Sequence, residues 1–456
     1  MDLKEAKSLL EENNVDNVRM IIVDINGTPV GKRLPVDKFL SVCAHGMSFC
    51  SGFYNLLGDS DIIPELPGIG GFSTGFPDVV AWPDLNTLKP VAWENCTALA
   101  ICDMRNSDGS EIPYDARTVL KKQLAKLAQH PFRMLAGMEY EFYVFKETAE
   151  TLVEKNWSNL HTFFQGPGVY SQVRSFKAGF FMRDIWQLLS QSGVPVDSMQ
   201  VELGAGMFEF PIKESDPLTA ADRAVIGKMA IKEICHHHGL LASFMAKIHP
   251  DLEGLSGAVH HSLIDPEGNN LFYDPNGHEK LSQTFDHWTE GILQNLQDMT
   301  LMLLPNFNSY KRPLPGCFVG NSTTWSIEGR GTTLRVINFD PNAVRIEDRL
   351  PGADGNPYLV LAAHIASGLW GIEHKLSLRP PFVGADPAFD TLGRDDVQYI
   401  PPSLGLAIER FQNSNRMKAF FGKEFCEVFA AHRQFDLEKA RSQVADWERK
   451  KFMENA

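Results

Sequence analysis

The stretch Arg345-Ile346-Glu347-Asp348-Arg349 places a carboxylate between two guanidinium groups at every second residue. If this stretch is a β-strand, these three side chains point the same way, because successive side chains of a strand alternate between its faces. A face that carries Arg, Glu and Arg suits a polyanion and its metal ion better than it suits a hydrophobic core. The stretch therefore predicts a strand that takes part in phosphate chemistry.

Length and charge narrow the class of protein. The chain has 456 residues, enough for two or three domains, or for one domain with a large body, and so for a complete enzyme. It carries 43 Lys and Arg against 57 Asp and Glu, a net charge of −14, and it has no basic run. Nucleic acid is therefore not an expected partner, and the expected substrate is small.

The N-terminus and the cysteines indicate a cellular compartment. Residues 1–7 form a charged amphipathic start without the apolar region of a signal peptide, and no run of about 18 apolar residues follows. The seven cysteines are scattered and include no Cys-x-x-Cys pair, which argues against a disulfide framework or a zinc site. We expect a soluble cytoplasmic protein without membrane contact.

Local patterns predict two domains. Residues 18–24 and 28–33 have the pattern of two strands joined by a tight turn, and with an apolar strand at 98–104 they define a first domain at residues 1–107. A second domain at residues 108–456 opens with a helix through Leu127 and an apolar strand from Leu135 to Phe145. Further helices are expected at residues 220–238, 287–304, 357–374 and 436–452.

Acidic residues recur at spacings that suit metal binding. Glu139 and Glu141 lie on one face of the apolar strand, where two buried like charges need a cation between them, although an exposed pair on an edge strand would look the same. Glu202 and Glu209 flank a glycine-rich bend that can bring the second carboxylate back toward the first. With Glu347 they make five oxygen ligands, which favour Mg²⁺ or Mn²⁺ over zinc.

Arginines accompany these carboxylates. A single arginine is most often a member of a surface ion pair. Several arginines interleaved with metal-type carboxylates instead favour a site for a transferring phosphoryl group. The arginines concerned are Arg330, Arg335, Arg345 and Arg349, and Arg312 in the Pro- and Gly-rich loop at residues 308–316.

These motifs together resemble the glutamine synthetase superfamily, in one order along essentially the whole chain. The matching segments are residues 139–141, 202–209, 256–263, 308–316, 329–336 and 345–359. The resemblance implies an α+β fold with a small N-terminal β-grasp domain and a large catalytic domain whose antiparallel sheet curves round the site. It also implies a homo-oligomer, a dodecamer of two stacked hexameric rings, with sites between subunits.

The resemblance also implies roles for single residues. Glu141, Glu202 and Glu209 are expected to bind a first metal ion, and Glu139 and Glu347 a second. Arg330, Arg335 and Arg345 are expected to hold the phosphates of ATP and of an acyl phosphate, with His260 and Ser262 also at the nucleotide. Arg312 and Arg349 are expected to hold the carboxylates of L-glutamate, with Gly254 and Arg330 at the substrate. Arg330, Glu347 and Arg312 are the expected catalytic residues.

The chain departs from the family pattern where the nitrogen nucleophile would bind. Family members that use ammonia carry an Asp where this chain has Cys50, and a Glu where it has Phe318. Ammonium should bind poorly without these acids, which favours an organic amine. Phe318 favours an apolar alkyl or aryl amine, since no acids for a polyamine tail are found in these loops; polyamine and ethanolamine stay open. Tyr170 is a further residue expected to line the amine pocket.

A second departure concerns the metals. Ala258 stands where the family supplies a histidine to the second metal, and Met207 stands where it supplies a glutamine. Water, His260 or His261 then fills the ligand position, or the second metal binds only together with nucleotide. We therefore expect an ATP- and Mg²⁺- or Mn²⁺-dependent glutamate–amine ligase that forms γ-glutamyl phosphate. The alternatives are a glutamine synthetase that uses ammonia and a non-catalytic structural or sensory relative.

Overall fold

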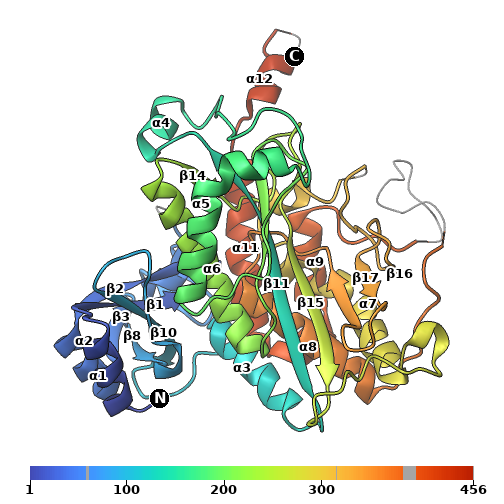
Figure 1. Cartoon of the computed structure of the whole chain (residues 1–456), viewed down its shortest axis with the longest axis horizontal. Helices are drawn as coiled ribbons and strands as arrows, with labels where there is room; N and C mark the ends of the chain where they lie inside the picture. The colour runs from blue at the N-terminus through green and yellow to red at the C-terminus, as the bar shows by residue number, and fades with distance from the viewer. Residues whose placement is uncertain (58–60, 315, 384–396, 455–456) are drawn as a thin grey trace.

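The computed structural model describes residues 1–57, 61–314, 316–383 and 397–454. Figure 1 shows a small N-terminal domain beside a larger domain built on long central strands and many helices. The predicted α+β class is confirmed. The segment predicted at residues 308–316 is described except for Pro315.

The N-terminal domain is built on a six-stranded sheet in the order β2-β1-β10-β8-β3, with β9 paired to β10. The predicted strand, turn and strand are present, and β1 pairs in parallel with β10 at the centre of the sheet. The elements are α1 (Leu3–Glu12), β1 (Asn17–Val23), β2 (Pro29–Pro35), α2 (Val36–His45), β3 (Met47–Cys50), β4 (Leu56–Leu57), β5 (Asp61–Ile62), β6 (Glu65–Leu66), β7 (Gly70–Gly71), β8 (Asp78–Pro83), β9 (Lys89–Pro90) and β10 (Thr97–Asn106).

The large domain is built on an eight-stranded sheet in the order β12-β13-β11-β15-β18-β17-β16, with β14 paired to β11. In β11 the partly exposed Glu139 and Glu141 alternate with the buried Met138, Tyr140 and Phe142, so one face of the strand packs and the other presents charged groups. The strands are β11 (Arg133–Phe145), β12 (Gln200–Val201), β13 (Met207–Pro211), β14 (Leu241–Ser243), β15 (Gly257–Ile264), β16 (Trp325–Ile327), β17 (Leu334–Ile337) and β18 (Arg345–Asp348).

Helices pack around this sheet, and α7 and α8 are apolar along most of their length and buried. Their N-termini are capped by Ser282 and Asn356, whose side chains accept backbone N–H groups of the first turn. The helices are α3 (Ala116–Leu127), α4 (Ala149–Glu154), α5 (Gln172–Gln191), α6 (Pro217–His237), α7 (Gln283–Leu303), α8 (Pro357–Glu373), α9 (Leu404–Asn413), α10 (Asn415–Phe421), α11 (Lys423–Arg441) and α12 (Asp446–Phe452).

The helix expected at residues 436–452 is wrong as a single element. Helix α11 ends at Arg441 and α12 begins at Asp446, and α12 projects away from the body of the molecule. The Ser442 hydroxyl donates to the carbonyl oxygen of Lys439 and so competes with the helical pattern at this end. Among the helices of the described ranges, none combines the length and the apolar character that a membrane crossing needs.

A buried arginine joins the two domains. Arg117, at the start of α3, is 2% exposed and contacts three carboxylates. Its guanidinium donates to Asp84 at 2.8 Å and to Asp222 at 2.9 Å, and it also pairs with Asp103. Asp84 and Asp103 belong to the N-terminal domain and Asp222 lies on α6, so one side chain holds charges from both domains.

Arg117→Met should lower the free energy of unfolding by about 3–5 kcal/mol, because it leaves buried carboxylates without their cation. Urea denaturation followed by circular dichroism measures this change. Lys122→Met is the matched control on α3, since Lys122 is exposed and lies 3.5 Å from an exposed Glu111; its effect should stay below about 1 kcal/mol. Equal effects of the two variants would contradict the role given to Arg117.

Candidate active site

Neighbouring strands bring the predicted acids to one face of the large sheet. Glu141 on β11 lies opposite Glu209 on β13, and His260 on β15 lies opposite Glu347 on β18. Glu139 is two residues from Glu141 and shares its face. Glu202 follows β12 directly, and Gly206, at φ +80°, turns the chain back so that Glu202 and Glu209 meet. The sequence predicted that these carboxylates lie close together, and the pairing register of β11, β13, β15 and β18 brings them to one face.

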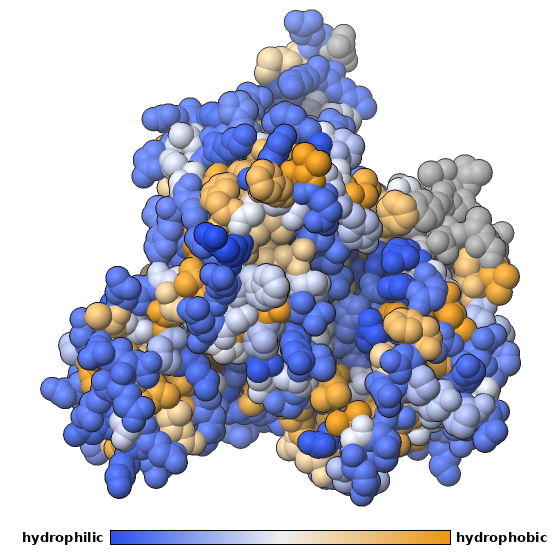
Figure 2. All heavy atoms as spheres, in the orientation of Figure 1, coloured by the Kyte–Doolittle hydropathy of each residue, from blue (hydrophilic) through white to orange (hydrophobic). Residues whose placement is uncertain are grey.

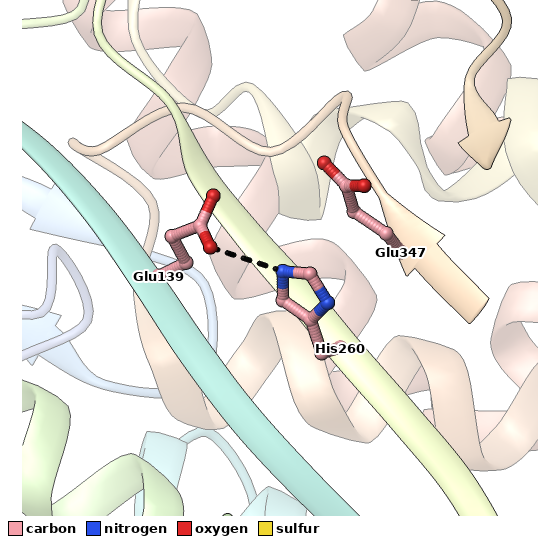
Figure 3. A group of neighbouring side chains, drawn as sticks. All are labelled: Glu139, His260 and Glu347. Carbon is pink, nitrogen blue, oxygen red and sulfur yellow. Dashed lines mark ion pairs between the residues drawn. The ribbon is translucent and has the colours of Figure 1, made fainter. Parts of the chain in front are cut away.

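Glu139, His260 and Glu347 form one cluster (Figure 3). His260 Nε2 lies 3.3 Å from Glu139 Oε2, and one ligand atom of each residue lies within 4.8 Å of the others. Ala258 faces Glu139 across the strand pair and offers no ligand. The His261 ring is buried on the other face, where Trp288 Nε1 donates to its Nε2 at 3.0 Å. Of the two histidines considered for the gap at Ala258, His260 is therefore the one that lies with the carboxylates.

A second group of carboxylates surrounds Gln200. The Gln200 amide nitrogen donates to Glu202 at 2.6 Å and to Glu209 at 2.9 Å, and Glu141 accepts the backbone N–H of Ser256. Burial, with the charges of the neighbouring glutamates, raises the pKa of Glu209 to about 10. Burial also raises the pKa of Glu141 to about 7. These acids repel one another and fit a bound divalent cation, which would supply the missing positive charge.

Arginines balance the charge of Glu347. Burial acts to raise the pKa of Glu347, but Arg349, His260 and Arg335 together hold it at about 2. Arg335 donates to Glu347 at 2.7 Å, and Arg349 donates to its other oxygen. Arg345 donates to His260 Nδ1 at 3.3 Å. Arg345, Glu347 and Arg349 therefore lie on one side of the sheet, as the alternation of a strand predicts.

Arg312 is held in place by backbone. Its guanidinium donates to the carbonyl oxygens of Leu350 at 2.6 Å and Arg349 at 2.9 Å, and its side chain is 2% exposed. Burial lowers its pKa to about 10, so it stays protonated at neutral pH. Behind this segment, Asp348 accepts from the N–H of Leu350 at 2.9 Å and lies 2.8 Å from His364 Nε2 on α8. The end of β18 is thus fixed from both sides.

Two cavities meet at these residues. The first, of about 610 Å³, contains the arginines Arg312, Arg330 and Arg349 together with Gly254, Tyr170 and Phe318. The second, of about 540 Å³, contains His261 and Ser262. Residues that line both cavities are Glu139, Gln200, Glu209, His260 and Arg345. All five predicted metal ligands therefore line the first cavity, which also contains the residues predicted to bind L-glutamate, and Glu139 and Glu209 lie where it meets the second cavity with Ser262.

Cys50 is not brought to either cavity within one chain. It ends β3 in the N-terminal domain, is exposed, and places its thiol 3.7 Å from the carbonyl oxygen of Phe76. A larger cavity of about 1140 Å³ lies between the domains and contains Lys228 and Lys232, but it includes none of the predicted site residues. We therefore place the site at the two smaller cavities.

The structure adds residues that sequence reasoning missed. Gln200 shares a face with Glu202 two residues away, a spacing that was available in the sequence. Glu253 lines the first cavity beside Gly254. His364 lies sixteen residues after Asp348 in the chain, and no local pattern links a helix residue to a strand residue at that separation.

Glu209→Gln should stabilise the protein without metal. With a pKa of about 10 the folded Glu209 keeps a proton that the unfolded chain, at its ordinary 4.5, releases, so this group destabilises the fold increasingly as pH rises between these values. A neutral Gln removes this penalty, which is on the order of 3 kcal/mol at neutral pH. Thermal unfolding is measured with and without Mg²⁺. Without Mg²⁺ the midpoint of Glu209→Gln should be higher than that of the wild type, and the rise in midpoint on adding Mg²⁺ should be smaller than in the wild type. Glu214→Gln, exposed on the same segment, should change neither; a lower midpoint for Glu209→Gln would contradict this account.

Comparison with known proteins identifies the family of this chain. A family model described as the glutamine synthetase catalytic domain matches residues 113–452. The chain is 31% identical over 454 residues to a glutamate–isopropylamine ligase of a Pseudomonas species, covering 99% of this chain and 97% of the relative. It is 34% identical over 433 residues to type-1 glutamine synthetase 2 of Dictyostelium discoideum, covering 94% and 82%. A solved structure described as a GmaS/ADP complex superposes with a TM-score of 0.85 at 25% identity over 99% of both chains. The chain belongs to the glutamine synthetase family.

Proposed function

We propose that this protein joins the γ-carboxylate of L-glutamate to an organic primary amine, with ATP converted to ADP and phosphate. The observation that carries the proposal is the composition of the first cavity. It keeps the carboxylates and arginines suited to making an acyl phosphate, but Cys317, Phe318 and Val319 also line it, and Phe318 stands where the resemblance implies an acid in members that use ammonia. The similar glutamate–isopropylamine ligase acts, as its name states, on an amine of this apolar kind.

ATP and two Mg²⁺ or Mn²⁺ ions are the proposed cofactors. The nucleotide would occupy the second cavity beside Ser262, with its terminal phosphates toward His260 and Arg345. Glu141, Glu202 and Glu209 would hold one ion, and Glu139, His260 and Glu347 the other; bound ions would neutralise the phosphates. The structure described as a GmaS/ADP complex supports a nucleotide site in this fold.

The remaining residues orient the reactants. Arg312 and Arg349 would hold the carboxylates of glutamate, since Arg312 is fixed by backbone carbonyls and both arginines face the first cavity. Arg330, Arg335 and Arg345 would stabilise the charge on the transferring phosphoryl group. Catalysis would then rest on positioning and electrostatics, with no covalent bond to the enzyme.

The mouth of the first cavity favours an apolar amine. Phe318 is 52% exposed and Tyr170 is 61% exposed, and both line this cavity together with Val169 and Leu203. An alkyl or aryl group would cover these side chains on binding and remove apolar surface from water. Ammonium has no such group and would gain nothing from this wall.

We also propose a cytoplasmic homo-oligomer, a dodecamer of two stacked rings. Its support is that Cys50 lies outside both cavities of its own chain and that apolar residues gather over α5 (Figure 2), where Val173 is 67% and Phe176 is 86% exposed. Exposed apolar groups of this kind mark protein interfaces. All seven cysteines are free thiols, which fits a reducing compartment.

Two alternatives make different predictions. A glutamine synthetase would use ammonia, as the name of the Dictyostelium relative suggests, but Cys50 and Phe318 oppose this reading. A sensory relative would not turn over at all. Against it, a scaffold gains nothing from keeping five repelling carboxylates together with arginines.

An amine panel separates the three functions. Phosphate release is measured with ATP, Mg²⁺ and glutamate across ammonium, isopropylamine, aniline, ethanolamine and putrescine. Release should be fastest with the alkylamine or aniline, because these cover Phe318. Efficient turnover with ammonium would refute the amine-ligase function, and release with none of the nucleophiles would favour the sensory protein.

Cys50→Asp combined with Phe318→Glu should raise the kcat/KM for ammonium, by on the order of tenfold, because two carboxylates would then attract the cation. The same variant should use isopropylamine less well, since the apolar wall is lost. Each single variant is the control, and it should show a smaller gain. No gain in the double variant would mean that other residues define the nitrogen pocket.

A further inference from the structure

Glu253 lines the first cavity, and the proposed function assigns no role to its carboxylate. Six glutamates line this cavity. Five of them are engaged through their side chains: Glu139 with His260, Glu141 with Ser256, Glu202 and Glu209 with Gln200, and Glu347 with Arg335 and Arg349. Within the described ranges, the half-buried Glu253 side chain has neither a hydrogen bond nor an ion pair.

The backbone around Glu253 is fixed. Its carbonyl oxygen accepts the Tyr143 hydroxyl at 3.2 Å, and burial together with the charges of Glu253 and Glu141 raises the pKa of Tyr143. The next residue, Gly254, lies against Arg312, since a Cβ there would be 2.6 Å from Arg312 Cγ. The loop therefore holds Glu253 beside the arginine that we assign to glutamate, in the cavity that Phe318 also lines.

An alkylamine presents a charge problem to this cavity. Near neutral pH such an amine is an ammonium ion, as its ordinary pKa is near that of a lysine side chain at about 10.4. It must bind as a cation and then lose a proton before its nitrogen can attack. The arginines of the cavity repel it, and neither Cys50 nor Phe318 supplies a negative charge.

We propose that Glu253 binds the ammonium group of the incoming amine and accepts a proton from it. This inference rests on the proposed function. In the step, R–NH₃⁺ gives one proton to the Glu253 carboxylate and becomes R–NH₂. The nitrogen lone pair forms the C–N bond to the acyl carbon of γ-glutamyl phosphate, the C–O bond to phosphate breaks, and phosphate leaves with that electron pair. The nitrogen then loses its second proton to solvent. Glu253 also releases the proton that it accepted to solvent and becomes a carboxylate again.

Glu253→Gln tests this role through two nucleophiles. The variant keeps the size of the side chain and removes its charge. The KM for isopropylamine should rise about tenfold to a hundredfold, the range expected when a charge-assisted hydrogen bond is lost. Hydroxylamine is mostly uncharged at neutral pH and needs no carboxylate, so its conversion to the γ-glutamyl hydroxamate should stay within about twofold of the wild type. The KM for glutamate should not change.

Asp251→Asn is the matched control, because Asp251 lies in the same loop with its side chain 89% exposed; it should leave every parameter unchanged. Glu253→Asp should restore part of the lost amine affinity. An unchanged KM for isopropylamine in Glu253→Gln would overturn the inference, and so would a rise in the KM for glutamate with both nucleophiles, which would assign Glu253 to the α-ammonium group of glutamate. Failure of the proposed function looks different: the wild type itself would then make no amide from isopropylamine.

Discussion

Glu347 is buried on β18, 2% exposed, between Arg335 and Arg349 and beside His260. A carboxylate in this position would be unstable without cations, and the two arginines remove that instability. The arrangement depends on β18 lying between β15 and β17, because β15 supplies His260 and β17 supplies Arg335. The charge balance of one residue thus couples three strands of the sheet.

The other acids are not balanced in this way. Glu141 and Glu209 face each other across β11 and β13, and Glu209 accepts a hydrogen bond from the neutral amide of Gln200 at 2.9 Å. Burial raises the pKa of both carboxyls, and the charges of neighbouring glutamates raise them further. The same sheet therefore contains one carboxylate, Glu347, whose charge is neutralised by arginines. It also contains a group of carboxylates, Glu141, Glu202 and Glu209, whose charge fits an added divalent ion. This contrast is what a site for metal-assisted phosphoryl transfer requires.

The two cavities of the site meet at shared residues and differ in their linings. Residues at their junction include Glu139, Glu209 and His260, so a phosphoryl group placed there can be approached from both sides. Polar groups line the second cavity at Ser262, and Phe318 and Tyr170 give the first cavity an apolar mouth. Glu253 lines the same first cavity, and among the described residues its carboxylate has no hydrogen-bond or ion-pair partner.

The sequence by itself determined the fold class, the central strands and the set of carboxylates and arginines, because alternation along a strand and ordered motifs are local properties. It predicted one face for Arg345, Glu347 and Arg349: Arg345 and Glu347 lie on β18, and Arg349, directly after the strand, donates to Glu347. It joined α11 and α12 into one helix because charged helical segments lie on both sides of residues 442–445, which contain neither Gly nor Pro to mark the break. Only the tertiary structure decided which histidine lies with Glu139 and Glu347, since strand register between β11, β15 and β18 fixes that contact. It also decided the partners that lie far apart in the chain, such as Asp348 with His364, and it brought Glu253 into the first cavity together with Arg312 and Phe318. These contacts depend on how separate elements pack, which no local pattern encodes.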